Sequence, residues 1–538
     1  MVKEKDHGVD RRTFIKSTAA GAGVIAASVS GFIGKGRSEA GAVESAGSSF
    51  ETPPPPIPAS EIRETVTTEV VVVGAGTAGM AATLSAAEAG ARVILIDKHT
   101  TFRAVGGYNG FIGSRLQKKL GFDIDPEEVI RELMKYGGNK PDQRLIRLWA
   151  YKSPEVIDWL LDMAEEAGIE VTIENAPFPP GIDWRDEINY KEYPAGHLFG
   201  GHNQRNVLKI LQDNALKNGA DIRYQINALQ LIRKEKGRVS GLIAKDKNGD
   251  YIQFNTDKGV ILCTGDYGSN PEMMEKYCPW AAEIARKQNS PFPALNTGDG
   301  HRMAMQVGAV MELPPHAPMD HVIGLFLPMG MDAFLRVNIL GERYENEDVP
   351  GQSMANSLFR QPEWKFWQVF DAKWPDEVSK MGIGLSKIIV GDEAQKKDLQ
   401  EKVNRGICLQ ADSIEELATK MKVPLETFKK TIARYNELAR LGKDLDFGKR
   451  VDRLTTVEKP PFYAGSGTPT FLIALGGMNV NPNLQALDAE RKVIPGLYLA
   501  GNTAGGFFAN DYPTMIPGLS HGRALTFGYI AGKNAAAE

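Results

Sequence analysis

The chain has 538 residues, 42% of them hydrophobic, with 63 Lys and Arg residues against 67 Asp and Glu residues. This length predicts two or more domains with packed cores, and the net charge of −4 gives no indication of a nucleic-acid partner. The three cysteines, Cys263, Cys278 and Cys408, form no C-x-x-C cluster, so we expect no c-type haem, iron–sulfur or other metal site. A disulfide between Cys278 and Cys408 stays open, although nothing in the sequence supports one.

The N-terminal segment has the features of an export signal. Asp10–Lys16 reads DRRTFIK, and a weakly apolar run rich in Ala and Gly then leads to an A-x-A-like site at Ala40–Ala42. This order is typical of a twin-arginine signal peptide over residues 1–42, whereas a solvated basic helix start is the alternative. The run is too interrupted for a stable membrane span. We therefore expect the Tat machinery to export the folded protein to the periplasm or another extracytoplasmic space.

Residues 43–67 contain the sequence PPPPIP at Pro53–Pro58 and few apolar side chains, which predicts an extended linker.

The segment Val70–Asp97 predicts a dinucleotide site. A β-branched run is followed by Gly74, Gly76 and Gly79 in the spacing G-x-G-x-x-G, then by an alanine-rich stretch and a second apolar strand ending at Asp97. In this strand–turn–helix–strand context the first glycine allows the turn, the second admits a pyrophosphate and the third permits close helix–strand packing. The helix N-terminus favours the anion, and Asp97 can accept from ribose hydroxyls. The alternative is an ordinary βαβ unit with glycine turns.

The rest of the chain alternates helical and strand patterns. Helices are expected over 126–137, 142–168, 204–217 and within 413–441, strands over 221–225, 239–246, 251–255 and 259–263, and surface loops over 177–203. Between residues 312 and 472 the sequence pattern differs from this alternation, and a glycine-rich αβ pattern then returns. The predicted domains are 68–311 and 473–538 for a dinucleotide-binding domain and 312–472 for an insertion.

Six segments in one order carry a family resemblance. They read VVVVGAGTAGMAA, GVILCTGDYG, NTGDGHRMAMQVGA, VNILGERYENE, ELATKMKVPLETFKKTIARYN, and VIPGLYLAGNTAGG with GRALTFGYIAGKNAA. The chain resembles the flavoprotein subunit of fumarate reductases and succinate dehydrogenases, especially its soluble, exported relatives. The resemblance implies an α/β fold, with an FAD-binding Rossmann-like (glutathione-reductase-like) domain and an inserted α+β clamp or capping domain.

The resemblance also implies residues that hold non-covalent FAD. The pyrophosphate, ribose, flavin and ribityl contacts implied are Gly74, Gly76, Ala78, Gly79, Asp97, Lys98, Gly106, Gly107, Asn109, Ala228, Thr264, Gly265, Asp299, Gly501 and Asn502, the last in place of the family's usual Glu. Backbone N–H groups of Leu519 and Ser520 would stabilise reduced flavin at its pyrimidine edge.

The substrate side departs from fumarate reductases. Gly351 stands where the family has a proton-delivering arginine, and Asp511 stands where a second arginine clamps a carboxylate. Leu472 and Ile473 replace the family's paired histidines. Because a dicarboxylate needs guanidinium partners and an Asp would repel it, we expect a larger, more neutral substrate.

The tail around Tyr512 and Gly518 is similar to that of 3-ketosteroid dehydrogenases. The resemblance implies that the Tyr512 hydroxyl and the Gly518 N–H hold a ketone oxygen, which would be an oxyanion hole for an enolate, and tyrosine can also donate a proton. The alternative is that Tyr512 only packs against its loop. His316 and Tyr108 are further candidates for catalysis, each weighed against a structural role, and Asp511 is a catalytic candidate or an accident of the loop.

The sequence thus predicts an exported FAD-dependent reductase of an activated C=C bond in an unsaturated ketone, lactone, ester or aromatic acrylate. Electrons would come from an external cytochrome or quinol-linked donor, because no second G-x-G-x-x-G indicates NAD(P)H. The alternatives are a 3-ketosteroid-type dehydrogenase and a flavin electron-transfer subunit without its own substrate. Arg343 with Glu347 is expected to be a structural pair, and Trp364, Trp367 and Trp374 are expected to be core residues.

Overall fold

The computed structural model describes residues 50–174, 191–287, 296–322, 327–382 and 391–538, all within one compact unit, Ser49–Glu538. The predicted signal peptide and residues 175–190 of the predicted loop region lie outside these residues. Among the described helices, none combines the length and the apolar character needed to cross a bilayer.

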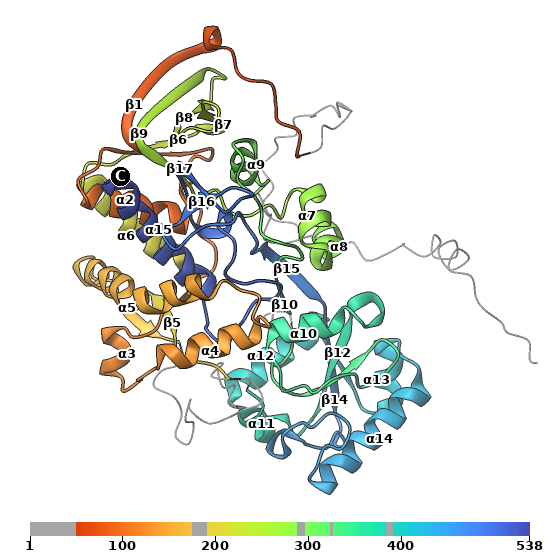
Figure 1. Ribbon diagram of the computed structural model, residues 1–538. Coiled ribbons are helices and arrows are strands. Elements are labelled where there is room, and N and C mark those ends of the chain that lie inside the picture. Colours follow the sequence, from red (N-terminus) through yellow and green to blue (C-terminus); the bar gives the residue numbers. More distant parts are fainter. Residues whose placement is uncertain (1–49, 175–190, 288–295, 323–326, 383–390) are drawn as a thin grey trace, which may run out of the picture. The chain divides into compact units, whose positions relative to one another are not determined.

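The largest sheet has the order β16-β17-β9-β1-β2-β6, with β7 and β8 forming an antiparallel extension on β9 (Figure 1). Its strands are β1 (Ile62–Val73), β2 (Val93–Asp97), β6 (Asp221–Tyr224), β7 (Asn227–Arg233), β8 (Val239–Lys245), β9 (Tyr251–Leu262), β16 (Gln485–Leu487) and β17 (Val493–Leu499). β17, β9, β1, β2 and β6 are parallel. Val70–Val73 are buried because helices cover the central strands, as is usual for a parallel sheet.

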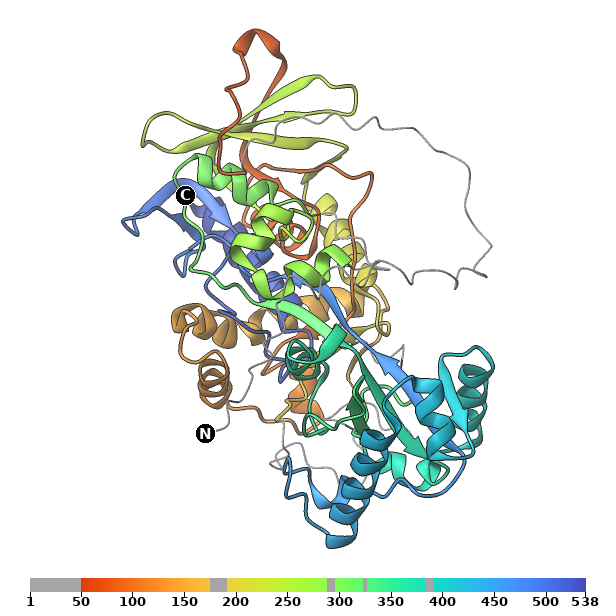
Figure 2. The same cartoon turned by 90° about the vertical axis from the view of Figure 1, so that its right-hand side faces the viewer.

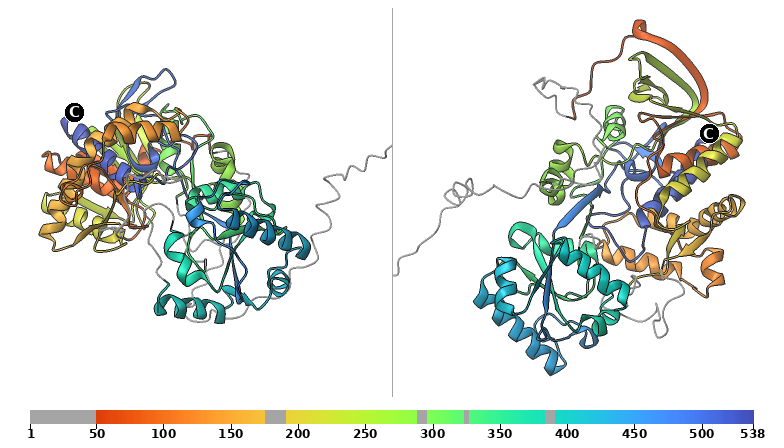
Figure 3. Two further views of the ribbon diagram at one scale, coloured as in Figure 1. Left: turned by 90° about the horizontal axis from the view of Figure 1, so that it is seen from below. Right: turned by 180° about the vertical axis from the view of Figure 1, so that it is seen from behind.

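Three helices far apart in sequence pack beside one another at this sheet: α2 (Thr77–Glu88), α6 (Gln204–Lys217) and α15 (Leu519–Ala537), seen from behind in Figure 3. The approach of α15 to α2 needs glycine. A Cβ on Gly528 would lie 2.2 Å from the Ala78 carbonyl oxygen, and one on Gly532 would lie 2.3 Å from that of Ala82. The C-terminal segment therefore completes the domain begun by residues 62–97.

Further elements flank this sheet. They are η1 (Ala59–Glu61), β3 (Asn109–Gly110), α3 (Arg115–Lys119), α4 (Pro126–Tyr136), α5 (Gln143–Glu166), β4 (Val171–Ile173), β5 (Gly196–Phe199), α7 (Pro271–Tyr277), α8 (Pro279–Lys287), α9 (Asp299–Gln306) and η6 (Gly501–Thr503). The small sheet has the order β3-β5-β4. The helices expected over 126–137, 142–168 and 204–217 are confirmed within two residues at each end.

Four sequence-based expectations differ from the structure. The predicted linker ends earlier, because residues 62–67 already pair with β9 as the start of β1. The strands expected at 251–255 and 259–263 form one strand, β9. A register shift opposite Thr68 and Val70 of β1 accommodates the polar residues between the two expected strands. Residues 196–199 form a strand in place of a surface loop, and β7 was not predicted.

A second antiparallel sheet with its own core lies in the segment predicted as the insertion. Its order is β11-β12-β14-β13. The elements of this segment are β11 (Leu335–Asn338), α10 (Gly351–Leu358), η3 (Pro362–Trp364), β12 (Phe366–Asp371), α11 (Trp374–Glu377), η4 (Val378–Lys380), α12 (Glu393–Asn404), β13 (Cys408–Ala411), α13 (Ile414–Met421), α14 (Leu425–Leu441), η5 (Val451–Arg453) and β14 (Phe462–Gly467). We call this the capping region.

The chain enters and leaves the capping region through one antiparallel pair. β10 (Pro318–Val322) pairs with β15 (Pro469–Ala474), drawn as the green and blue strands that run side by side in Figure 2. The predicted boundaries at 312 and 472 fall close to this pair and remain predictions. The expected core role of the tryptophans holds for Trp367 and Trp374, which are buried, and Trp364 packs against a third apolar cluster. All three cysteines are free, and Cys278 and Cys408 lie in different apolar clusters.

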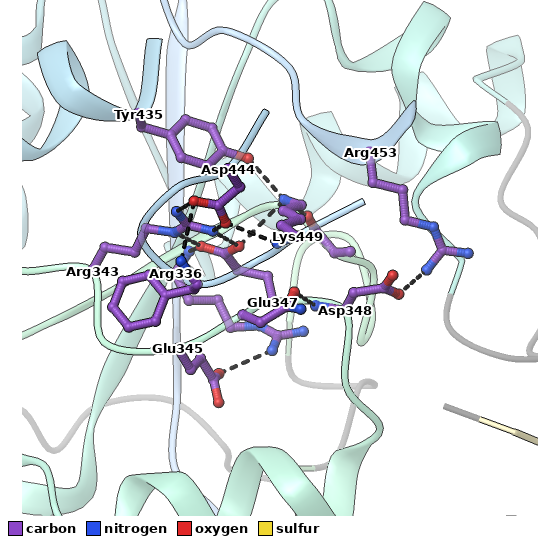
Figure 4. Close-up of polar contacts among 12 residues, drawn as sticks. Arg336, Arg343, Glu345, Glu347, Asp348, Tyr435, Asp444, Lys449 and Arg453 are labelled. Atoms are coloured by element: carbon purple, nitrogen blue, oxygen red, sulfur yellow. Dashed lines mark hydrogen bonds and ion pairs between the residues drawn. The ribbon is translucent and has the colours of Figure 1, made fainter. Parts of the chain in front are cut away.

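The expected structural pair Arg343–Glu347 is confirmed and lies in a larger buried ionic cluster (Figure 4). Arg343 donates to Glu347 at 2.7 and 2.8 Å and to Asp444 at 3.1 and 2.8 Å. Lys449 lies 3.4 Å from the second Glu347 oxygen and donates to the Tyr435 hydroxyl at 2.7 Å. The Arg343 guanidinium holds the pKa of Asp444 well below its usual range. These charges link loop 342–348 to loop 444–449.

Candidate active site

The glycine-rich turn has the conformation that a dinucleotide cradle needs. Gly74 ends β1 with φ +105°, which only glycine adopts without strain. Gly76 caps α2, and a Cβ there would meet no atom within 4 Å, so the space above it is open. A Cβ on Gly79 would lie 1.8 Å from the Gly74 carbonyl oxygen. Gly74 and Gly79 thus have the backbone roles that the motif predicts, and the N–H groups at the start of α2 adjoin the open space above Gly76.

The predicted ribose and ribityl residues gather at the carboxyl ends of the parallel strands, where ligands bind in such sheets. Asp97 ends β2 and accepts a hydrogen bond from the Ala75 N–H at 2.7 Å. Lys98 forms a 2.7 Å ion pair with Asp299 at the start of α9. The Thr264 hydroxyl accepts from the Gly300 N–H at 3.1 Å, and a hydrogen bond joins it to Thr503 beyond β17. Ala228, the predicted adenine contact, is buried in β7.

The loop Gly106–Gly110 lies against the N-terminus of α15. Gly110 N–H donates to the Gly518 carbonyl at 2.9 Å, and His521 Nδ1 lies 2.9 Å from the Tyr108 carbonyl. Gly518 has φ +76°, and a Cβ there would lie 2.4 Å from the Tyr108 carbonyl group. Asn109 is buried in the same loop and accepts from Gln204 at 3.0 Å. The structure therefore brings Gly106, Gly107, Asn109, Gly518, Leu519 and Ser520 together.

Three residues of the flavin prediction, which stays a prediction, form hydrogen bonds within the protein. The Leu519 N–H donates to the Ile516 carbonyl at 3.1 Å, since the first helical turn closes on the preceding loop, and the Ser520 N–H donates to the Tyr512 hydroxyl at 3.3 Å. Both groups predicted to face the flavin thus have partners within the protein. Asn502 likewise accepts from Arg523 at 2.6 Å, so its side-chain oxygen is engaged with a guanidinium.

Arg523 is a fully buried cation that sequence reasoning missed. It also donates to the Gly501 and Ala504 carbonyls at 2.8 and 2.9 Å, which fixes the loop after β17. Glu312 binds the same loop by accepting from the Gly506 N–H at 2.8 Å, and it also accepts from the Gly477 N–H at 2.9 Å in the segment after β15. Burial raises the pKa of Glu312 to about 7. Arg523 lies in the segment GRALTFGYIAGKNAA, but its role, like that of Glu312, depends on contacts with segments distant in sequence.

Tyr512 and Asp511 lie where α15, α4 and the capping region meet. The Tyr512 hydroxyl reaches the first turn of α15, as noted above, and its ring lies 6.0 Å from that of His321 on β10. Asp511 Oδ1 accepts from Gln352 at 2.9 Å and from Tyr512 N–H at 2.8 Å. Its Oδ2 accepts from Tyr136 at 2.9 Å and from Asn356 at 2.8 Å. Burial raises the pKa of Asp511 although these bonds oppose the shift.

Gly351 begins the helix that supplies Gln352 and Asn356. A Cβ on Gly351 would lie 2.8 Å from Met331 Sδ and 3.1 Å from the Val322 carbonyl oxygen, so the position has little room for any side chain. The resemblance places arginines at positions 351 and 511. Here the neutral amides of Gln352 and Asn356, on the helix that begins at Gly351, bind the Asp511 carboxylate.

The side chains of His316 and Tyr108 both have hydrogen-bond partners outside the Tyr512 group. His316 is fully buried, with Nδ1 2.7 Å from the Tyr267 hydroxyl and Nε2 3.1 Å from the Glu312 carbonyl. Burial lowers its pKa to about 4, so it is a neutral residue within an aromatic cluster. Both ring nitrogens of His316 are thus engaged within the protein, and its contact with the substrate stays a prediction. The Tyr108 hydroxyl bonds Glu174, and burial raises the pKa of both groups, that of Glu174 to about 7.

Residues 69–513 match the family described as "FAD binding domain". The chain belongs to this family. It is an FAD-dependent oxidoreductase, and its open Gly76 cradle, positive-φ turn at Gly74 and strand-end Asp97 fit the cofactor.

Relatives extend along most of the chain. A vinyl phenol reductase of Lactiplantibacillus plantarum is 28% identical over 87% of this chain and 96% of its own length. A 3-oxosteroid 1-dehydrogenase of Mycolicibacterium smegmatis is 26% identical over 87% of this chain and 97% of its own. The open conformation of a flavocytochrome c3 fumarate reductase superposes with a TM-score of 0.65, at 26% identity, over 89% of this chain and 79% of the other.

Proposed function

We propose that this FAD-dependent oxidoreductase reduces an activated, uncharged C=C bond, as in an unsaturated ketone, lactone, ester or aromatic acrylate ester. The observation that carries the proposal is Asp511, a buried carboxylate held by uncharged donors where a dicarboxylate would need a cation. The similarity to a vinyl phenol reductase supports a substrate without a carboxylate. Because the sequence resembles exported flavoproteins, we also propose twin-arginine export and an extracytoplasmic cytochrome or quinol-linked electron donor.

Within this proposal the chain's own residues bind and polarise the substrate. Bound FAD would supply the hydride. The Tyr512 hydroxyl can donate a hydrogen bond to a carbonyl oxygen, and the N-terminus of α15 places positive potential beside it. As negative charge develops on that oxygen, both contributions strengthen, which is the physical basis of an oxyanion hole. The apolar residues Phe508 and Met515 are buried in the same segment and help to exclude water.

Replacing Tyr512 with phenylalanine should lower kcat about 100-fold at unchanged FAD content, because one donor to the developing oxyanion is lost. Steady-state kinetics with a reduced viologen dye as donor would measure this. Tyr463→Phe is the matched control, because Tyr463 stacks on Phe370 in the capping region and should leave kcat unchanged. Wild-type kcat in Tyr512→Phe would show that Tyr512 only packs in its loop.

The substrate class is tested by anaerobic reduction of the purified holoenzyme, followed by flavin reoxidation with fumarate, urocanate, a cinnamate ester, a ketosteroid enone and an unsaturated lactone. The proposal expects fast reoxidation by an uncharged acceptor and none by fumarate. Efficient reoxidation by fumarate would overturn the argument from Asp511.

A second candidate is the reverse reaction, a dehydrogenase that introduces a double bond beside a ketone. The similarity to a 3-oxosteroid 1-dehydrogenase over nearly its whole length favours it. Rapid reduction of oxidised enzyme by a saturated 3-ketosteroid, with no reoxidation by the enone, would identify this direction. An enzyme that exchanges electrons with dyes but with none of these compounds would be an electron-transfer subunit.

A further inference from the structure

A second buried carboxyl group lies beside Asp511. Asp320 is on β10 and is fully buried. Its backbone N–H donates to Gln352 Oε1 at 3.0 Å, and the same Gln352 side chain donates to Asp511 at 2.9 Å, so one amide links the two residues. The negative charge of Asp511 acts on Asp320. We call Asp320 and Asp511 the carboxyl pair.

The two members of the carboxyl pair have opposite surroundings. Four donors point at Asp511, two on each oxygen, which stabilises its ionised form. By contrast, neither oxygen of Asp320 has a hydrogen-bond partner among the described residues. Burial and the charge of Asp511 raise the pKa of Asp320 well above its ordinary value. Hence Asp511 is the member of the carboxyl pair that ionises first, and Asp320 is the member that retains the proton.

No cation relieves this arrangement. In the described parts of the chain, no Lys or Arg forms an ion pair with either carboxyl group, and the other titratable groups nearby are the Tyr136 hydroxyl on α4 and the Cys278 thiol between α7 and α8. Burial raises the pKa of Cys278, so it is a neutral thiol. His321, next to Asp320, is also neutral because burial lowers its pKa to about 4, and its Nε2 has no partner in the described structure.

We propose that Asp320 is the acid that protonates the substrate carbon in the reduction, with Asp511 as the residue that keeps it protonated. A buried carboxylic acid whose O–H has no acceptor in the protein is poised to donate to a ligand. The pair adjoins Tyr512 through Asp511 and through the contact of His321 with the Tyr512 ring. Position 351, where the resemblance places a proton-delivering arginine, is a glycine and has no side chain that could donate a proton.

The proton transfer from Asp320 rests on the proposed function. Bound FAD, reduced by the external donor, would supply the hydride for one carbon of the C=C group. The Asp320 O–H bond breaks and its proton bonds the other carbon, which uses the electron pair of the double bond. Two adjacent carboxylates then repel each other, which favours rapid reprotonation of Asp320. Tyr136 is half-buried, and its hydroxyl donates to Asp511 at 2.9 Å.

The protonation state is tested without turnover. Infrared spectra of the holoenzyme at pH 7 should show, beside the absorption of protonated Glu174, Glu312 and Asp332, a protonated carboxyl band that is lost in Asp320→Asn. Because the folded pKa of Asp320 exceeds the unfolded value, the folded state retains a proton that the unfolded chain releases, and stability falls as pH rises from about 4, the ordinary pKa of an aspartate, toward the raised pKa of Asp320. The melting temperature of Asp320→Asn should fall less over this range. Persistence of both the band and the wild-type slope would overturn the proposal.

Steady-state turnover tests whether Asp320 transfers the proton to the substrate. With an uncharged acceptor, Asp320→Asn should lose about 100-fold or more in kcat and lose the alkaline decline of the wild-type pH profile, and Asp320→Glu should recover part of both. Asp332→Asn is the control, because burial raises the pKa of Asp332 to about 8 in the capping region, and it should keep wild-type kcat. Unchanged kcat in Asp320→Asn would overturn the proton transfer even if the band were lost. A wild-type enzyme that reduces no acceptor would overturn the proposed function and this step with it, whereas loss of the band would still establish the protonated Asp320.

Discussion

Replacing Gly76 with valine should give a folded protein that no longer holds FAD. Gly76 has φ −87° and ψ −170°, which valine adopts, and its Cβ would meet no protein atom within 4 Å. The new side chain would instead fill the open space at the N-terminus of α2, where the family places the pyrophosphate. We expect FAD affinity to fall about 1,000-fold or more, equivalent to about 4 kcal/mol of binding free energy. Flavin absorbance after dialysis and fluorescence titration with FAD would measure the loss.

Gly79→Val provides the contrast for this prediction. Its Cβ would collide with the Gly74 carbonyl oxygen, so this variant should lose both FAD and the folded state. Circular dichroism separates the two outcomes, because Gly76→Val should keep the wild-type spectrum of the apoprotein. A Gly76→Val protein with normal FAD content would mean that the dinucleotide does not pass over this turn.

Replacing Arg343 with methionine should lower the free energy of unfolding by about 3–5 kcal/mol. The Arg343 side chain is 6% exposed, and those of Glu347 and Asp444 are fully buried. Without the guanidinium, Glu347 would keep Lys449 as an ion-pair partner, and Asp444 would lose its charged partner. The cost therefore comes mainly from uncompensated buried charge. Urea denaturation followed by tryptophan fluorescence would measure it, because Trp367 and Trp374 lie in the cores of this region.

Arg434→Met is the matched control for Arg343→Met. Arg434 lies on α14 and also pairs with two acids, Glu437 and Asp446, but its side chain is 41% exposed. Solvent screens such pairs, so this variant should lose less than about 1 kcal/mol. Equal losses in the two variants would contradict the view that burial gives the cluster its importance.

Much of the cofactor site could be predicted because it is encoded locally. Gly74, Gly76 and Gly79 lie within six residues of one another, and their roles follow from backbone sterics that need no distant partner. The helices over 126–137 and 204–217 could be predicted for the same reason. By contrast, the start of β1 and the continuity of β9 depend on each other, since the polar residues of each strand are stabilised by pairing with the other strand.

The sequence by itself determined the family, the FAD cradle and the absence of the two arginines that the resemblance places at positions 351 and 511. Only the tertiary structure decided what stands in their place, because Asp320, Gln352 and Asp511 are far apart in the chain and meet where β10, α10 and the C-terminal segment converge. The same holds for His316, whose sequence context suggested a substrate contact but whose two ring nitrogens are both engaged in the core. Local spacing specifies backbone conformation, whereas burial and charge pairing, which set the protonation of Asp320, arise from contacts that the linear sequence does not show.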